Sequence, residues 1–280
     1  MSDNWIVANL ENAFTTWNEK LSEIWNLVTT TPQNFKGGGI WSVIVNINGG
    51  LQAIGYGLLI LFFAMSIFKA TASFRDFQRP EYALKHFIRF VAAKVAVTYA
   101  MDIMMKIYEI CGGVVTQITA GLGGIGGASV TLPASLETAI EDVGFWASIP
   151  LWLVTILGSL FITVLSFIMI MSVYGRFFKL YMYTALAPVP LSSFAGEGTS
   201  EVGKHFIKSY IGVCLEGAVI VLACVIYSAF VSFAGTPSLD TSITPVTMVW
   251  KYIGEVIFNM LVLVGLIKGS DQIIKNMLGT

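Results

Sequence analysis

The chain has 280 residues, of which 55% are hydrophobic and only 12% are charged, and its mean hydropathy is +0.75. Soluble domains carry roughly 25% charged residues, so this composition argues against a water-soluble fold and indicates a protein that lies in a lipid bilayer. The net charge of −1, the three cysteines and the two histidines give no basis for nucleic-acid binding by bulk charge, a disulfide framework or a metal centre.

An amphipathic helix is predicted over residues 3–28. Its apolar side chains recur every three or four residues, at Ile6, Leu10, Phe14, Trp17, Leu21, Ile24 and Val28, and acidic residues occupy the opposite face. Such a helix either lies in a membrane interface or docks on a partner, and we favour the interface. Because Thr31-Pro32 and three successive glycines from Gly37 end the pattern, we expect an extracytoplasmic helix and linker over 1–36 and a transmembrane domain over 37–280.

Five membrane spans are predicted in that domain. A hydrocarbon core about 30 Å thick requires roughly 20 apolar residues per helix. Segments of this kind are 49–68, 90–110, 149–173, 209–234 and 248–267. The stretch 180–195 is also apolar, but Pro188 and Pro190 interrupt it, and broken backbone in lipid has to be covered by protein or water. We therefore predict an all-α polytopic membrane protein with a re-entrant or interfacial element before the fourth span.

The basic residues predict the orientation, because cytoplasmic loops carry an excess of lysine and arginine. Most of them follow the first, third and fifth predicted spans: Lys69, Arg75, Arg79, Lys85 and Arg89, then Arg176, Lys179, Lys204 and Lys208, then Lys268 and Lys275. We therefore expect a multi-pass protein of the cytoplasmic membrane with its N-terminus outside and its C-terminus in the cytoplasm.

Polar residues at helical spacing form the candidate site. In the second span Lys94, Thr98, Asp102, Lys106 and Glu109 follow one another at intervals of three or four residues, and Glu216, Glu255 and Asn259 add polar groups to later spans. Charges in a membrane are costly unless paired or wetted. Two interpretations stay open, a polar stripe that lines a passage and a set of salt bridges that hold one helix bundle together. From depth alone we expect Lys94 to pair with Glu216.

The sequence shows no catalytic constellation. Gly198 to Lys204 matches a phosphate-binding loop up to its lysine, but His205 stands where Ser or Thr would bind magnesium, and no strand is predicted before it. We expect neither enzymatic activity nor a cofactor, although a bound phospholipid would be compatible with a membrane protein.

The segment from Tyr174 to Leu191, YGRFFKLYMYTALAPVPL, and the segment from Gly203 to Tyr210, GKHFIKSY, carry a family resemblance. Together they resemble the TrbL-like membrane subunits of conjugative type IV secretion systems, in the variety found in Gram-positive conjugative elements. The resemblance implies a channel or scaffold subunit for DNA or protein translocation. It also implies a homo-oligomer of five or six copies, partner subunits that include a cytoplasmic ATPase, and transient contact with a DNA–protein substrate.

The resemblance gives the proline-broken segment a role to test. Arg176, Lys179, Pro188 and Pro190 would form a cytoplasmic mouth or gate, and the alternative is a rigid turn that leads back to the fourth span. A self-contained secondary transporter is the alternative function, because transporters also contain broken helices. Transporters often show internal repeats, and we see none between the two halves of this chain.

Overall fold

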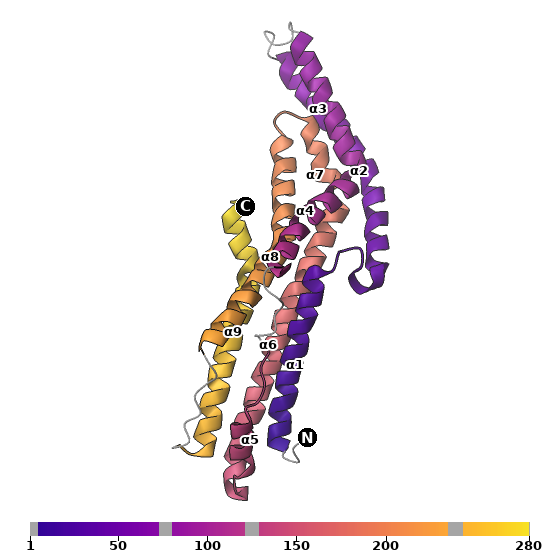
Figure 1. Ribbon diagram of the computed structural model, residues 1–280. Helices are drawn as coiled ribbons and strands as arrows, with labels where there is room; N and C mark the ends of the chain where they lie inside the picture. The colour runs from indigo at the N-terminus through magenta and orange to yellow at the C-terminus, as the bar shows by residue number, and fades with distance from the viewer. Residues whose placement is uncertain (1–4, 73–79, 121–128, 235–242, 280) are drawn as a thin grey trace. The chain divides into compact units, whose positions relative to one another are not determined.

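The computed structural model describes residues 5–72, 80–120, 129–234 and 243–279, and the regular elements in this part of the chain are all helices (Figure 1). The predicted all-α class is therefore confirmed. Four helical segments are long and apolar enough to cross a membrane: Phe35–Thr71, Ser148–Leu186, Ser200–Val231 and Pro245–Leu278. They correspond to the predicted spans that begin at residues 49, 149, 209 and 248.

The predicted span 90–110 is divided between two helices. Helix α3 (Pro80–Thr98) and helix α4 (Ala100–Ala120) meet at Tyr99, where the chain changes direction (Figure 1). Backbone hydrogen bonds of helical spacing continue across the junction, from the amide of Tyr99 to the carbonyl of Val95 and from Ile103 to Tyr99, both at 2.9 Å. Neither helix is among the four apolar segments, because the charged residues of this region lower its hydropathy.

The chain divides into two compact units. The first unit contains Met1–Thr29, Val115–Gly175 and Ala218–Ser270, and the second unit contains Thr30–Val114, Arg176–Gly217 and Asp271–Thr280. This division by contacts is of another kind than the predicted one, which separates an extracytoplasmic segment 1–36 from a transmembrane domain 37–280. The predicted division stays a prediction.

In the first unit, helix α1 (Trp5–Thr29) buries its apolar face, and every residue of the predicted stripe is less than 5% exposed. Helix α1 runs along helix α6 (Phe145–Leu186), and two hydrogen bonds connect them. Ser159 donates one to the carbonyl of Asn9, and Tyr174 donates one of 2.7 Å to Glu23. The short helix α5 (Ala134–Glu141) precedes α6. The apolar face of α1 is thus covered by this chain itself, which favours the docked alternative over a helix in the membrane interface.

Helix α6 is longer than the predicted span. Its 42 residues extend over roughly 63 Å at 1.5 Å per residue, about twice the thickness of the hydrocarbon core. It ends at Leu186, and α7 (Pro188–Ser192), η2 (Ser193–Ala195) and α8 (Ser200–Ala234) follow. The prolines therefore start a short helix, since proline is tolerated in a first helical turn. Helix α9 (Pro245–Leu278) ends the described chain.

In the second unit, α2 (Gly39–Ala72) and α3 form a hairpin, and α7 and η2 pack against both helices. The backbones of α2 and α7 approach closely at Gly55 of α2, where a Cβ atom would lie 2.8 Å from the carbonyl oxygen of Pro188. A buried apolar core that includes Leu59, Met104 and Leu191 joins α2, α4 and α7. The backbone of the proline-broken segment is thus covered by protein, as the prediction of a re-entrant element requires.

A tight turn precedes α2. The short helix η1 (Phe35–Gly38) contains left-handed backbone at Lys36, Gly37 and Gly38, with φ values of 49°, 74° and 78°, which two glycines adopt without strain. Phe35 stacks on Phe177 of α6 with ring centroids 4.2 Å apart. The predicted break after residue 31 is confirmed, and the turn is anchored by an aromatic contact.

Candidate functional site

Charged side chains from α6, α8 and α9 come together in the second unit. We call them the charge cluster, and its members are Arg176, Lys179, Glu216, Asp271 and Lys275. Three of these residues, Arg176, Lys179 and Glu216, are among the predicted candidates. The cluster is the largest group of interacting charges that the described residues show within one unit.

Arg176 is buried against the backbone of α8. Its side chain is 1% exposed and donates from Nε to the carbonyl of Val213 and from Nη2 to the carbonyl of Cys214, both at 3.3 Å. A Cβ atom on Gly217 would lie 2.5 Å from Cζ of Arg176, so glycine makes room for the guanidinium. The ring of Tyr108 lies 6.0 Å from Cζ, within the range of a cation–π contact. Two carbonyls and an aromatic face thus offset part of the cost of burying this cation.

Lys179 connects acids from two other helices. Its Nζ atom lies 3.0 Å from a carboxylate oxygen of Asp271 and 3.4 Å from one of Glu216. The second oxygen of Asp271 pairs with Lys275, one turn further along α9, at 2.8 Å. Glu216 is 5% exposed, whereas the side chain of Lys179 is 36% exposed, so the cluster is buried on the α8 side and open on the other. The ionic contacts tie three long helices together at one level.

Contacts within the second unit show where the cluster lies along α2. Phe177, the neighbour of Arg176, stacks on Phe35, just before α2 begins. Near the other end of α2, the hydroxyl of Ser66 accepts a hydrogen bond of 3.4 Å from the amide of Glu197. The charge cluster is therefore level with the beginning of α2, and the turn that contains Glu197 is level with its end.

This placement sets two predictions against each other. If α2 begins on the outer side, as the basic residues predict, then Arg176 and Lys179 lie toward the outer side and not at a cytoplasmic mouth. The physical reason is that α6 continues to Leu186, so both residues lie inside a helix and not in the loop after it. The role of Arg176, Lys179, Pro188 and Pro190 as a gate stays a prediction, and it requires the opposite orientation of α2.

The predicted polar stripe is intact and exposed. Lys94, Thr98, Asp102, Lys106 and Glu109 are all exposed in the second unit, and the continuous backbone hydrogen bonds at Tyr99 keep their helical spacing across the junction of α3 and α4. Thr98 donates to the carbonyl of Lys94 at 2.8 Å and lies 2.9 Å from the hydroxyl of Tyr56. The stripe thus presents its charges to the surroundings of the unit.

The charge pairs differ from the expected ones. Glu216 pairs with Lys179, and Lys94 is exposed and forms no ion pair within the described part of the chain, so the predicted pairing of Lys94 with Glu216 is wrong. Depth along a helix does not specify which face of it meets a neighbour. Lys106 pairs with Glu109 at 2.7 Å and not with Asp102. Glu255 and Asn259 are partly exposed residues of the first unit.

The glycine-rich sequence that resembles a phosphate-binding loop has a packing role at Gly203. Helix α8 begins at Ser200, so Gly203 lies in its first turn, where a Cβ atom would lie 2.9 Å from the ring of Phe194. Lys204 pairs with Glu201 at 2.7 Å. The element before this sequence is the 3₁₀ helix η2. This agrees with the sequence, which predicts no strand there.

The structure shows several polar contacts that the sequence does not predict. Asp271 joins the charge cluster, Asn48 donates to the carbonyl of Thr184 at 2.7 Å, and Gln52 donates to the carbonyl of Thr98 at 2.8 Å. The signal that could have found Asn48 and Gln52 is their presence in an otherwise apolar helix, where an amide requires a partner.

Comparisons with known proteins identify the family. The family described as TrbL/VirB6 plasmid conjugal transfer like protein matches residues 17–188, which is more than half of the chain and contains the α2–α3 hairpin, α4 and α6. No curated protein and no solved structure matches the chain. The resemblance predicted from the sequence is confirmed. With its four apolar helices and this match, the chain belongs to the TrbL/VirB6 family of membrane proteins of conjugal transfer.

Proposed function

We propose that this protein is a channel or scaffold subunit of a conjugative type IV secretion system that takes part in moving DNA or protein across the cytoplasmic membrane. The family supplies the conjugal context. The observation that carries the channel role is the polar stripe, which stays exposed on α3 and α4, the first of which packs beside the apolar helix α2.

The stripe requires a cover in the bilayer. A lysine or aspartate at the centre of a membrane helix costs about 2.5–3.5 kcal/mol on insertion scales, unless protein or water surrounds it. Neither Lys94 nor Asp102 forms an ion pair among the described residues, which speaks against salt bridges within one bundle. A neighbouring copy of the chain or an aqueous passage would supply the cover. We therefore propose a homo-oligomer of five or six copies whose stripes face a shared passage.

The proposed orientation follows the basic end of the α2–α3 hairpin. Four basic residues lie near this end: Lys69, Lys85, Arg89 and Lys204. Two more, Arg75 and Arg79, fall outside the described residues. The excess of basic residues on cytoplasmic sides supports a cytoplasmic position for this end, with the N-terminus outside. The charge cluster, which includes Asp271 and Lys275 near the end of α9, then lies toward the outer side, so the predicted cytoplasmic C-terminus conflicts with this orientation and stays a prediction. In a Gram-positive cell, a cytoplasmic ATPase and other secretion subunits would complete the machine.

A mating assay tests the passage. In cells that lack the gene, the wild-type chain is expected to restore transfer, and the double variant Lys94→Gln/Asp102→Asn is expected to lower transfer frequency at least tenfold at an unchanged membrane level. The matched control is Glu201→Gln/Lys204→Gln, which removes an exposed pair of opposite charges outside the stripe. Normal transfer by the stripe variant would contradict an essential role of these charges. Substrate-coupled flux by the purified protein alone would instead indicate a secondary transporter.

A further inference from the structure

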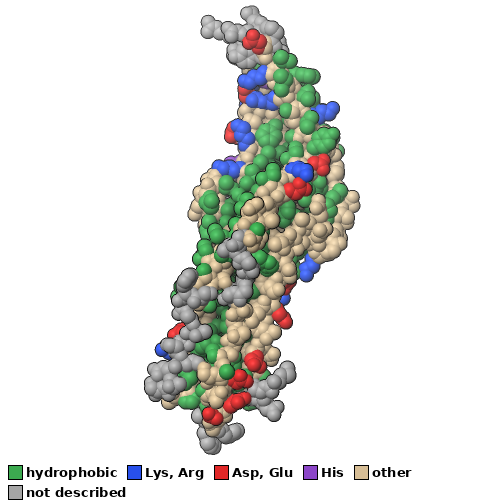
Figure 2. All heavy atoms as spheres, in the orientation of Figure 1, with side chains coloured by type: hydrophobic (Ala, Val, Ile, Leu, Met, Phe, Trp, Pro, Cys, Tyr) green, Lys and Arg blue, Asp and Glu red, His purple; other side chains and the backbone are tan. Residues whose placement is uncertain are grey.

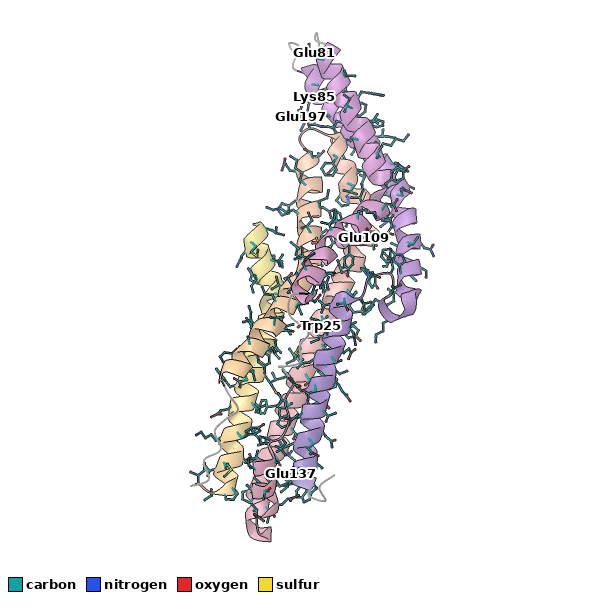
Figure 3. The ribbon with its side chains drawn as sticks, viewed as in Figure 1. Trp25, Glu81, Lys85, Glu109, Glu137 and Glu197 are labelled. Carbon is teal, nitrogen blue, oxygen red and sulfur yellow. The ribbon has the colours of Figure 1, made fainter. Side chains whose placement is uncertain are left out.

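The second unit contains a cavity at the basic end of the α2–α3 hairpin. Its volume is about 340 Å³, and its lining includes Met65, Ser66 and Lys69 of α2, His86 of α3, and the turn Gly196–Thr199 before α8. Figure 3 shows Lys85 and Glu197 close to one another at this end, and in Figure 2 basic side chains gather over the same part of α3. Nothing in the family match assigns a ligand to this place.

A buried polar pair forms one wall of the cavity. The hydroxyl of Ser66 accepts from the amide of Glu197 at 3.4 Å and lies 3.3 Å from Nδ1 of His86. Either atom of this second contact can be the donor, according to the tautomer of the imidazole. Ser66 is 5% exposed and His86 is 9% exposed, so both are held in place by packing. The cavity wall therefore offers two polar side chains in fixed positions.

Lys69 reaches the cavity from α2. Its Nζ atom would lie 3.5 Å from a Cβ atom on Gly198, which places the ammonium directly over the glycine of the turn. Within the described chain Lys69 forms no ion pair, although two other cations, Lys85 and Arg89, and the carboxylate of Glu197 belong to the same end of the hairpin. The ammonium is thus available to an anion in the cavity.

The carboxylate on the cavity is already neutralised. Glu197 lies 3.5 Å from Nζ of Lys85 and 3.6 Å from a guanidinium nitrogen of Arg89. These two cations and Lys69, which lines the same cavity, outnumber the one carboxylate, so the local charge is positive. An anionic group, and a phosphate in particular, matches this balance of charge.

One side of the cavity is apolar and open. Leu61, Met65 and Phe68 follow one another at spacings of four and three residues on α2 and are 52%, 40% and 76% exposed. Met65 also lines the cavity, so this apolar stripe runs up to its edge. Cations at the end of an apolar helix are placed where lipid head groups lie, and the cytoplasmic leaflet is rich in anionic lipids.

We propose that this cavity binds the phosphate head group of an anionic phospholipid, with Lys69 as its cationic contact, the Ser66–His86 pair as its wall and the acyl chains along Leu61, Met65 and Phe68. The volume fits a head group and not a whole lipid. The site would fasten the α2–α3 hairpin to the leaflet at its basic end. Binding in detergent depends on neither the orientation nor the channel role, so its failure can be told apart from theirs.

Native mass spectrometry of the purified full chain tests the proposal with three probes: phosphatidylglycerol, phosphatidylcholine and inorganic phosphate. We expect retained phosphatidylglycerol, at least tenfold less phosphatidylcholine, and no displacement by millimolar phosphate. Lys69→Gln is expected to lower retention at least tenfold, whereas the matched variant Lys204→Gln, an exposed lysine outside the cavity, leaves it unchanged. Glu197→Gln is expected to raise retention, because it removes the carboxylate.

Three outcomes would overturn the proposal. Equal retention by Lys69→Gln and the wild type would place the lipid elsewhere. Equal retention of the two lipids would show that charge does not select the ligand. Displacement by inorganic phosphate would assign the cavity to a free anion. Because Lys69 is exposed, its substitution leaves packing intact, and an unchanged melting temperature confirms that the variant is folded.

Discussion

The apolar stripe of α1 in the first unit is buried, the charge cluster in the second unit is buried on its α8 side, and the two differ in how they are specified. The stripe is local, since residues three and four apart share one face of a single helix and all become buried. The cluster joins residues such as Lys179 and Asp271, which are far apart in the chain and have no common period. Hydrophobic periodicity tells which face is buried, but it does not tell which partner a buried charge meets.

The largest loss of stability should come from a substitution in the apolar stripe of α1. Trp17 is fully buried, so we expect Trp17→Ala to destabilise the protein by about 3–5 kcal/mol through lost burial and the cavity left behind. Trp5, 52% exposed in the same helix, is the matched control, and Trp5→Ala should cost far less. Thermal unfolding in detergent gives both values. Equal losses for the two variants would mean that α1 is not docked through its apolar face.

The next largest loss of stability should come from replacing Lys179, the cation that joins the acids of the charge cluster. Lys179 contacts both Glu216 and Asp271, so Lys179→Met removes one charged contact from each of two carboxylates and should cost about 1–3 kcal/mol. Lys275 contacts the same Asp271 but is half exposed and one turn away on the same helix. Lys275→Met should therefore cost only about 0.2–0.5 kcal/mol. If denaturant unfolding ranks the two variants in the opposite order, Lys179 is not the residue that joins the helices.

The contact between α2 and α7 lies between the ends that the cluster and the cavity occupy along α2. Gly55→Ala would place a methyl group 2.8 Å from the carbonyl of Pro188, and we expect overpacking to cost about 1–3 kcal/mol. Gly57 has open space around its Cα, so Gly57→Ala two residues away should be neutral or slightly stabilising, because alanine favours helix. A melting temperature that rises in both variants would show that α7 does not pack on α2 as described.

The fold was largely predictable and the site only partly so, for the same reason. The α1 face, the break after Thr31 and the apolar spans follow from periodicity, composition and turn residues, all of which are local. The exposed stripe from Lys94 to Glu109 also follows from spacing. The partner of Glu216, the role of Gly217 and the participation of Asp271 depend on which faces of α6, α8 and α9 meet, and no local pattern contains that information.

Labelling the two ends of α2 is the test with the smallest expected effect on stability. The orientation that it reveals decides which side of the membrane the charge cluster occupies. Ser42 and Thr71 are exposed residues near the two ends of α2, and replacing either with cysteine is conservative enough to leave folding unchanged. The three native cysteines are buried and supply the unlabelled background.

In intact cells stripped of their wall, a membrane-impermeant thiol reagent should label Ser42→Cys, and it should label Thr71→Cys only after permeabilisation. Because Phe35 stacks on Phe177 beside Arg176, label at residue 42 from outside would place the charge cluster toward the outer side as well. The reverse pattern would restore Arg176 and Lys179 to a cytoplasmic mouth. It would also contradict the proposed orientation, since Lys69, Lys85 and Arg89 would then lie on the outer side against the positive-inside rule.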